Sequence, residues 1–181
     1  MAERFLESLK SKLLVCDGAM GTELIRRGLE PGICPETWNA DYPADVTAIH
    51  KAYVAAGADV ILANTFGANR WKLENYGLGG NVRDINAAGV AVARKAAARR
   101  AYVLGDVGPT GRFLAPLGTD PREAFVDVFA EQAEALAKAG ADGLILETFT
   151  ALDEILAAVE GAKRTGLPVV ASMSFARTAD G

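Results

Sequence analysis

The chain has 181 residues, of which 50% are hydrophobic, 7% aromatic and 23% charged. This mixture is typical of one globular domain and excludes a disordered chain or a disulfide scaffold, which need lower hydrophobicity or more cysteines. A formal net charge of -4 with interspersed charges argues against nucleic acid or an anionic membrane as the main partner. No apolar run approaches the roughly 18 residues of a membrane-spanning helix. The first twelve residues are charged where a signal peptide is apolar, so we expect a cytoplasmic protein.

Short apolar runs alternate with longer helical patterns along the chain. Five strands are predicted from apolar runs with little alternation, as in strands covered on both faces of a parallel sheet: 13–17, 60–64, 101–106, 143–147 and 168–174. Four long helices are predicted between them: 43–56, 82–98, 121–139 and 151–165. Shorter helices are expected after the first two strands, and this order predicts an α/β fold.

An internal repeat refines this prediction. Residues 56–66 align without gaps on residues 139–149, an offset of 83 residues that corresponds to two strand–helix units of about 41 residues each. Repetition at alternate strands favours a (β/α)8 barrel of the TIM type over a flavodoxin-like open sheet. Eight such units need roughly 330 residues. We therefore expect residues 1–181 to be the N-terminal part of a barrel domain, truncated after about five strands, with the remaining strands absent from this chain.

Carboxylates stand at the predicted ends of three strands, where parallel α/β folds collect functional residues. Asp17, Asp106 and Glu147 are expected to converge on one mouth, where they suit an ammonium group, a metal ion or acid/base chemistry. Gly18 and the helix that follows allow backbone N–H groups to hold a carboxylate, so this strand end is suited to clamp an amino acid. The alternative is that Asp17 only caps that helix.

Two cysteines and one histidine limit the available chemistry. Cys16 lies in an apolar run and is expected to be a buried packing residue, and Cys34 is expected to have no chemical role. A four-ligand zinc site cannot be assembled from Cys and His here. His50 is interpreted as a packed or surface residue of its helix.

Two further features have mainly structural interpretations. The loop at 105–111 has neither a Walker motif nor a dinucleotide fingerprint, so we interpret it as structural. Phe66 and Phe149 end the two copies of the repeat, and each is suited either to line a pocket or to pack in the core.

Seven short segments, taken together, carry a resemblance to a known family. They occur in order at 17–22, 35–39, 50–53, 56–59, 64–69, 105–111 and 147–149. The ordered set resembles the homocysteine S-methyltransferase domain family and covers nearly all of the chain. Segments 64–67 and 108–111 look most like the N-terminal homocysteine-binding module of the cobalamin-dependent methionine synthases.

The resemblance implies a (β/α)8 barrel that binds homocysteine and transfers a methyl group to its sulfur, giving methionine. It implies that Asp17 and Glu147 hold the substrate amino group, and that backbone N–H groups of Gly18 and Ala19 hold its carboxylate. The full set of expected substrate-binding residues lies at the predicted strand ends: Asp17, Gly18, Ala19, Asn64, Thr65, Phe66, Asp106 and Glu147.

The resemblance also implies cofactors and partners. In the family, zinc bound by three cysteines activates the thiol; Cys16 and Cys34 do not match those positions, so the zinc ligands are expected beyond Gly181. Methylcobalamin and methyltetrahydrofolate are the expected methyl sources, bound by cobalamin- and folate-binding modules of the same longer protein. We therefore expect this chain alone not to catalyse methyl transfer.

Two alternatives to the methyltransferase interpretation stay open at this point. One is a barrel lyase or aldolase that uses the three carboxylates with a divalent metal ion. The other is a non-catalytic half-barrel that binds a small molecule or pairs with another chain through its unpaired strand edges.

Overall fold

A single parallel sheet organises the protein, whose computed structural model describes residues 2–175. Residue 1 and residues 176–181 of the predicted domain lie outside the described residues. The sheet has the strand order β1-β2-β3-β4, with all pairs parallel. The strands are β1 (Val60–Leu62), β2 (Tyr102–Val107), β3 (Gly143–Phe149) and β4 (Val169–Met173). The α/β fold with a parallel sheet is confirmed, and these four strands lie close to their predicted ranges.

The first predicted strand is shorter than expected. Instead of a strand over 13–17, the structure has one parallel bridge between Cys16 and Val60. The N–H of Asp17 donates to the carbonyl of Val60 at 2.9 Å, and the carbonyl of Val15 accepts the N–H of Asp59 at 2.8 Å. The ladder stops at Asp17 because the chain leaves the sheet there and begins a helix three residues later.

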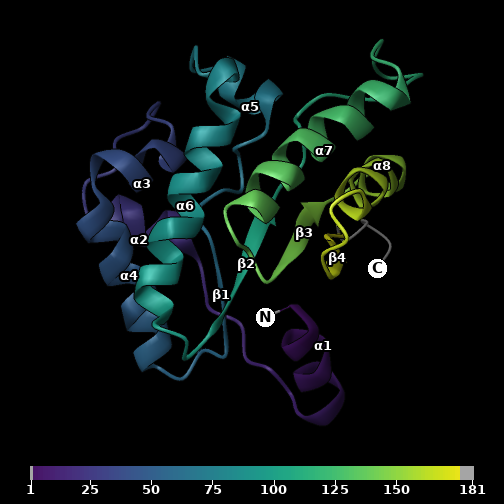
Figure 1. Ribbon diagram of the computed structural model, residues 1–181. Helices are drawn as coiled ribbons and strands as arrows, with labels where there is room; N and C mark the ends of the chain where they lie inside the picture. Colours follow the sequence, from purple (N-terminus) through teal and green to yellow (C-terminus); the bar gives the residue numbers. More distant parts are fainter. Residues whose placement is uncertain (1, 176–181) are drawn as a thin grey trace, which may run out of the picture.

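The long helices cover one side of the sheet, and α1 (Ala2–Ser11) lies apart from them (Figure 1). The long helices are α4 (Pro43–Ala55), α6 (Val82–Ala97), α7 (Arg122–Lys138) and α8 (Leu152–Lys163). The other short elements are α2 (Met20–Arg26), α3 (Trp38–Asp41), α5 (Arg70–Glu74) and the 3-10 turns η1 (Pro35–Thr37) and η2 (Gly79–Asn81). Successive long helices contact one another in the order α4, α6, α7 and α8. Within residues 2–175, no helix is long and apolar enough to cross a membrane.

The main hydrophobic core lies between the sheet and these helices. Phe125, Phe129 and Leu136 of α7 are buried there together with Val103 of β2 and Leu144 of β3. Burial of large apolar side chains at about 1.5–3 kcal/mol each makes this interface the main source of stability.

The opposite face of the sheet carries a second, smaller cluster and the polar residues of interest. Phe5 of α1 packs there with Leu104, and Ile145 lies against the same cluster. Because side chains alternate along a strand, Asp106 lies on the same face as Leu104, and Glu147 on the same face as Ile145. The strands thus present apolar residues to α1 near their start and carboxylates near their carboxyl ends.

The internal repeat has a structural explanation. Its two copies lead into β1 and β3, which are separated by β2. In each copy the glycine adopts a positive φ, 103° and 93°, which ends the preceding helix. The aspartate two residues later then accepts an N–H from the neighbouring segment: Asp59 from Val15 at 3.1 Å, and Asp142 from Val103 at 2.9 Å. The repeated motif therefore fixes the start of a strand against the preceding segment.

Candidate substrate cavity

A cavity of about 580 Å³ opens at the carboxyl ends of the strands. Its lining consists of Asp17, Gly18, Ala19, Met20, Gly21, Thr22, Pro35, Glu36, Leu62, Ala63, Asn64, Phe66, Asp106, Glu147 and Thr148. The structure therefore brings together seven of the predicted substrate-binding residues, and Thr65 is the one outside this lining. The volume is in the range that holds a small ligand.

Asp17 is fixed at the end of its short parallel segment. Its Oδ2 accepts the N–H of Leu62 at 3.0 Å, and the Cys16 thiol donates weakly to its Oδ1 at 3.7 Å. Burial, with a smaller contribution from Glu147, raises the pKa of Asp17 to about 6. The helix cap of α2 is Ala19, with no side-chain capping bond, so Asp17 does not serve as that cap. Of the two interpretations of this carboxylate, the capping one is wrong.

Glu147 reaches the cavity through an irregularity in β3. The register between β3 and β4 shifts between Leu146 and Phe149, and Thr148 has a positive φ of 65°. A threonine rarely adopts this left-handed conformation, and such strain gathers at functional sites. Partial burial raises the pKa of Glu147. The bulge thus ends the regular alternation where the carboxylate meets the cavity.

Asp106 is the most buried of the three predicted carboxylates, with 7% exposure. Its Oδ1 has no hydrogen-bond partner among the described residues. Burial raises the pKa of Asp106 well above its usual value, and Glu147, Asp17 and Glu36 raise it further through charge repulsion.

Glu36 is a cavity carboxylate that was not selected from the sequence. It is buried, and its Oε1 accepts the N–H of Gly67 at 2.6 Å while its Oε2 accepts the thiol of Cys34 at 3.2 Å. A Cβ on Gly67 would stand 2.8 Å from that same Oε1, so a larger residue there would have to displace the Glu36 carboxylate. The available signal was the place of Glu36 in segment 35–39, which entered only through the resemblance.

Asn64 and Thr65 hold neighbouring backbone in place. The Nδ2 of Asn64 donates to the carbonyl of Pro35 at 2.9 Å and to Oδ1 of Asn39 at 3.2 Å. The Oγ1 of Thr65 donates to the carbonyl of Asp106 at 2.8 Å and accepts its N–H at 3.1 Å. The structure therefore directs the Thr65 hydroxyl to the backbone of β2.

The backbone at Gly18 and Ala19 forms the cavity wall next to α2. Tyr53 donates its hydroxyl to the carbonyl of Ala19 at 3.0 Å, and a Cβ on Gly18 would lie 3.1 Å from the Tyr53 ring. Glycine therefore permits this close contact. No side chain caps the N-terminus of α2, and its first residues line the cavity. Their backbone N–H groups are therefore hydrogen-bond donors in a cavity whose charged side chains are carboxylates.

The two repeat phenylalanines have different roles. Phe66 lines the cavity, and a Cβ on Gly108 would stand 2.5 Å from its ring. Phe149 is fully buried and packs against Phe129, with ring centroids 5.7 Å apart.

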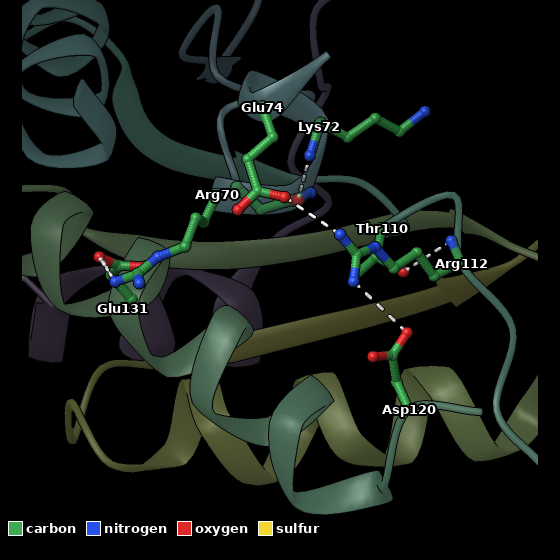
Figure 2. Close-up of polar contacts among 8 residues, drawn as sticks. Arg70, Lys72, Glu74, Thr110, Arg112, Asp120 and Glu131 are labelled. Carbon is green, nitrogen blue, oxygen red and sulfur yellow. Dashed lines mark hydrogen bonds and ion pairs between the residues drawn. The ribbon is translucent and has the colours of Figure 1, made fainter. Parts of the chain in front are cut away.

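The loop that follows β2 is held by Arg112, as Figure 2 shows. The Arg112 guanidinium pairs with Glu74 at 3.0 Å and with Asp120 at 3.4 Å, and lies 4.3 Å from the Trp71 ring centroid. Thr110 accepts the N–H of Arg112 at 3.1 Å. These contacts agree with the structural interpretation of this loop.

The described residues do not fit a zinc ion. Within 2–175 there is no group of three His, Cys, Asp or Glu side chains that could hold a metal. The prediction that Cys16 is buried is wrong: Cys16 is exposed, because its segment pairs with β1 through one bridge only and the neighbouring Val15 is exposed as well. Cys34 is buried beside Glu36. Partial desolvation of each sulfur, together with the carboxylate beside it (Asp17 for Cys16, Glu36 for Cys34), raises the pKa of both thiols to about 12, which disfavours the thiolate that zinc requires.

Fold and cavity together define an α/β domain of parallel strands with an acidic pocket at their carboxyl ends, suited to a small ligand with a cationic group. The chain belongs to the homocysteine S-methyltransferase family, whose model matches residues 14–181. It is 37% identical over 173 residues to methionine synthase of Mycobacterium tuberculosis, covering 88% of this chain and 14% of that protein. It is 31% identical over 184 residues to betaine–homocysteine S-methyltransferase 1 of Bos taurus, covering 97% of this chain and 44% of that protein.

A solved structure gives the same fold. The metallated form of the homocysteine methyltransferase MmuM from Escherichia coli superposes with a TM-score of 0.76 and 29% identity, covering 97% of this chain and 66% of that one. The chain thus spans less than two thirds of the relatives it matches. These relatives are methyltransferases, and their likeness supports the predicted barrel-type α/β class.

Proposed function

We propose that the chain is the homocysteine-binding part of a methyltransferase that makes methionine. The observation that carries this proposal is the convergence of Asp17, Asp106 and Glu147 on one cavity in a member of the homocysteine S-methyltransferase family. Carboxylates in a half-buried pocket are suited to an ammonium group, because they replace the water that solvates it.

The two ends of the amino acid are held by different walls of the cavity. Asp17 and Glu147 accept hydrogen bonds from the ammonium group. Backbone N–H groups of Gly18, Ala19 and the first turn of α2 donate to the carboxylate. Asn64 fixes the backbone wall by its bond to Pro35, and Phe66 supplies an apolar surface for the side chain of homocysteine.

The chain's own part in the reaction is therefore to bind and orient homocysteine. Zinc, which the family resemblance implies, would make the thiol a nucleophile; its ligands are proposed to lie beyond Gly181. Methylcobalamin and methyltetrahydrofolate are the proposed methyl sources, held by further modules of a longer cytoplasmic protein. We also propose that residues 1–181 form the N-terminal part of a (β/α)8 barrel domain, and that this chain alone does not transfer methyl groups.

Calorimetric titration with L-homocysteine tests the substrate assignment. Asp17→Asn and Glu147→Gln should each weaken binding about 10- to 100-fold, since each removes a charged hydrogen bond of about 1.5–3 kcal/mol. The matched controls are Asp127→Asn and Glu134→Gln, which change exposed ion pairs of α7. Unchanged affinity in both cavity variants would remove the assignment.

A further inference from the structure

Asp106 differs from the other cavity carboxylates in having a fully buried oxygen without a hydrogen-bond partner among the described residues. Asp17 accepts the N–H of Leu62, and Glu36 accepts the N–H of Gly67. Oδ1 of Asp106 accepts nothing from the described residues although it is fully buried. A buried acceptor without a hydrogen-bond partner costs about 1–3 kcal/mol of stability. This cost at Oδ1 is removed when the carboxyl group takes up a proton or when a ligand donates a hydrogen bond to it.

Hydrogen bonds hold the backbone that carries the Asp106 side chain. The Oγ1 of Thr65 bonds both the backbone N–H and the backbone carbonyl of Asp106. The Nε2 of Gln132 in turn donates to the carbonyl of Thr65 at 2.7 Å. Gln132 and Thr65 are both fully buried. The backbone of β2 at Asp106 is therefore held by Thr65 and, behind it, Gln132, which fixes the point from which the Asp106 side chain enters the cavity.

Among the described residues, no cation lines the cavity beside Asp106. The charged groups that act on it are Asp17 from the segment before β1, Glu36 from η1 and Glu147 from β3. Among the described residues that line the cavity, none is Lys, Arg or His. Several carboxylates in one half-enclosed site cannot all ionise, because their repulsion is poorly screened there. Burial and this repulsion raise the pKa of Asp106 well above its usual value.

We propose that Asp106 holds a proton in the ligand-free protein and releases it when the ammonium group of the amino acid binds. The O–H bond of the carboxyl group breaks, the proton passes to solvent, and an N–H of the ammonium group becomes the donor to the same carboxylate. No electrons are exchanged. Binding of the substrate thus exchanges a proton on Asp106 for the ammonium group. This exchange rests on the proposed function, since it requires an amino acid in the cavity.

This exchange predicts which ligands the cavity accepts. An α-amino acid supplies the positive charge that replaces the proton. A ligand with the same side chain and carboxylate but no amino group leaves Asp106 protonated, so its binding releases no proton. The cavity therefore selects for the amino group by charge as well as by hydrogen bonding.

Calorimetry with L-methionine separates this exchange from any ionisation of a thiol, because methionine has the same amino-acid portion and no thiol. Titrations of the full chain in buffers of different ionisation enthalpy, at about pH 7.5, give the number of protons released. That pH lies above the pKa of Asp17 of about 6, so Asp17 contributes little. We expect protons to be released when methionine binds, up to one per ligand, and the affinity to rise with pH by at most about tenfold per pH unit.

Asp106→Asn is the decisive variant, since asparagine has nearly the same shape as aspartate but no carboxyl group that can take up or release a proton. It should bind methionine with almost no proton release, whereas the control Asp127→Asn should behave like the parent. Equal proton release by parent and Asp106→Asn, or no release by the parent, would overturn the exchange while leaving homocysteine binding intact. Failure of the parent to bind homocysteine or methionine at any pH would instead overturn the proposed function.

Discussion

The burial of His50 in α4 can be tested directly through the pH dependence of stability. It is the only histidine of the chain and is 0% exposed, and neither ring nitrogen has a hydrogen-bond partner among the described residues. Burial lowers the pKa of His50 from 6.5 to about 4. The ring is therefore neutral in the folded protein, while the unfolded chain takes up a proton below about pH 6.5.

The size of the effect follows from these two values. A fall in pKa from 6.5 to about 4 corresponds to about 3–4 kcal/mol in total, using about 1.4 kcal/mol per pKa unit, and about 3 kcal/mol of it is lost by pH 4. Because the folded pKa is depressed, this stability is present above pH 6.5 and is lost as the pH falls toward 4. Against a typical total of about 5–15 kcal/mol, the loss is large.

Urea unfolding of the parent and of His50→Leu, measured from about pH 8 to about pH 4, isolates this contribution. The difference in unfolding free energy between the two proteins should move by about 3 kcal/mol in favour of the leucine variant as the pH falls. Thr47→Val, at another buried position of α4, is the control and should keep the pH dependence of the parent. A difference that stays constant across the range would show that His50 is protonated, and therefore hydrated or paired, in the folded state.

Two further substitutions test the cavity. Thr65→Val removes the hydroxyl that bonds both backbone groups of Asp106. It should destabilise the protein by about 1–3 kcal/mol and weaken binding in the calorimetric titration with homocysteine. Thr65→Ser keeps the hydroxyl and should retain the affinity of the parent. Gly108→Ala places a Cβ 2.5 Å from the Phe66 ring and should cost about 1–3 kcal/mol in urea unfolding, with weaker binding, whereas Gly80→Ala, which meets nothing within 4 Å, should change neither.

The arrangement of strands was predictable because apolar runs and glycine-ended helices repeat along the chain. The segment at 13–17 shows the limit of that reasoning. Its apolar letters favour a strand, yet Leu13 is 94% exposed and Val15 is 60% exposed. Hydrophobic pattern alone does not show how far a neighbouring strand extends to pair with it, and β1 is short, Val60–Leu62.

The cavity was predictable in outline for a related reason. Strand ends of a parallel sheet meet at one edge, so Asp17, Asp106 and Glu147 could be brought together from their positions alone. Side-chain direction within a turn is a different matter. Thr65 follows β1 but bonds the backbone of β2, and Glu36 reaches the cavity from a 3-10 turn that no apolar period reveals. Both depend on tertiary contacts that local sequence does not encode.

The titrations of Asp17 and His50 change the stability of the fold in opposite directions over nearly the same pH range. The pKa of Asp17 is raised from 3.8 to about 6, so its stabilising effect is present below 3.8 and is lost as the pH rises toward 6. His50 acts with the opposite sign over almost the same range. In the ligand-free protein the two trends oppose each other. A bound ammonium group keeps Asp17 ionised, so protonation of Asp17 no longer stabilises the folded protein as the pH falls. Only the destabilising effect of His50 then remains. Ligand-bound protein should therefore lose stability more steeply on acidification than ligand-free protein.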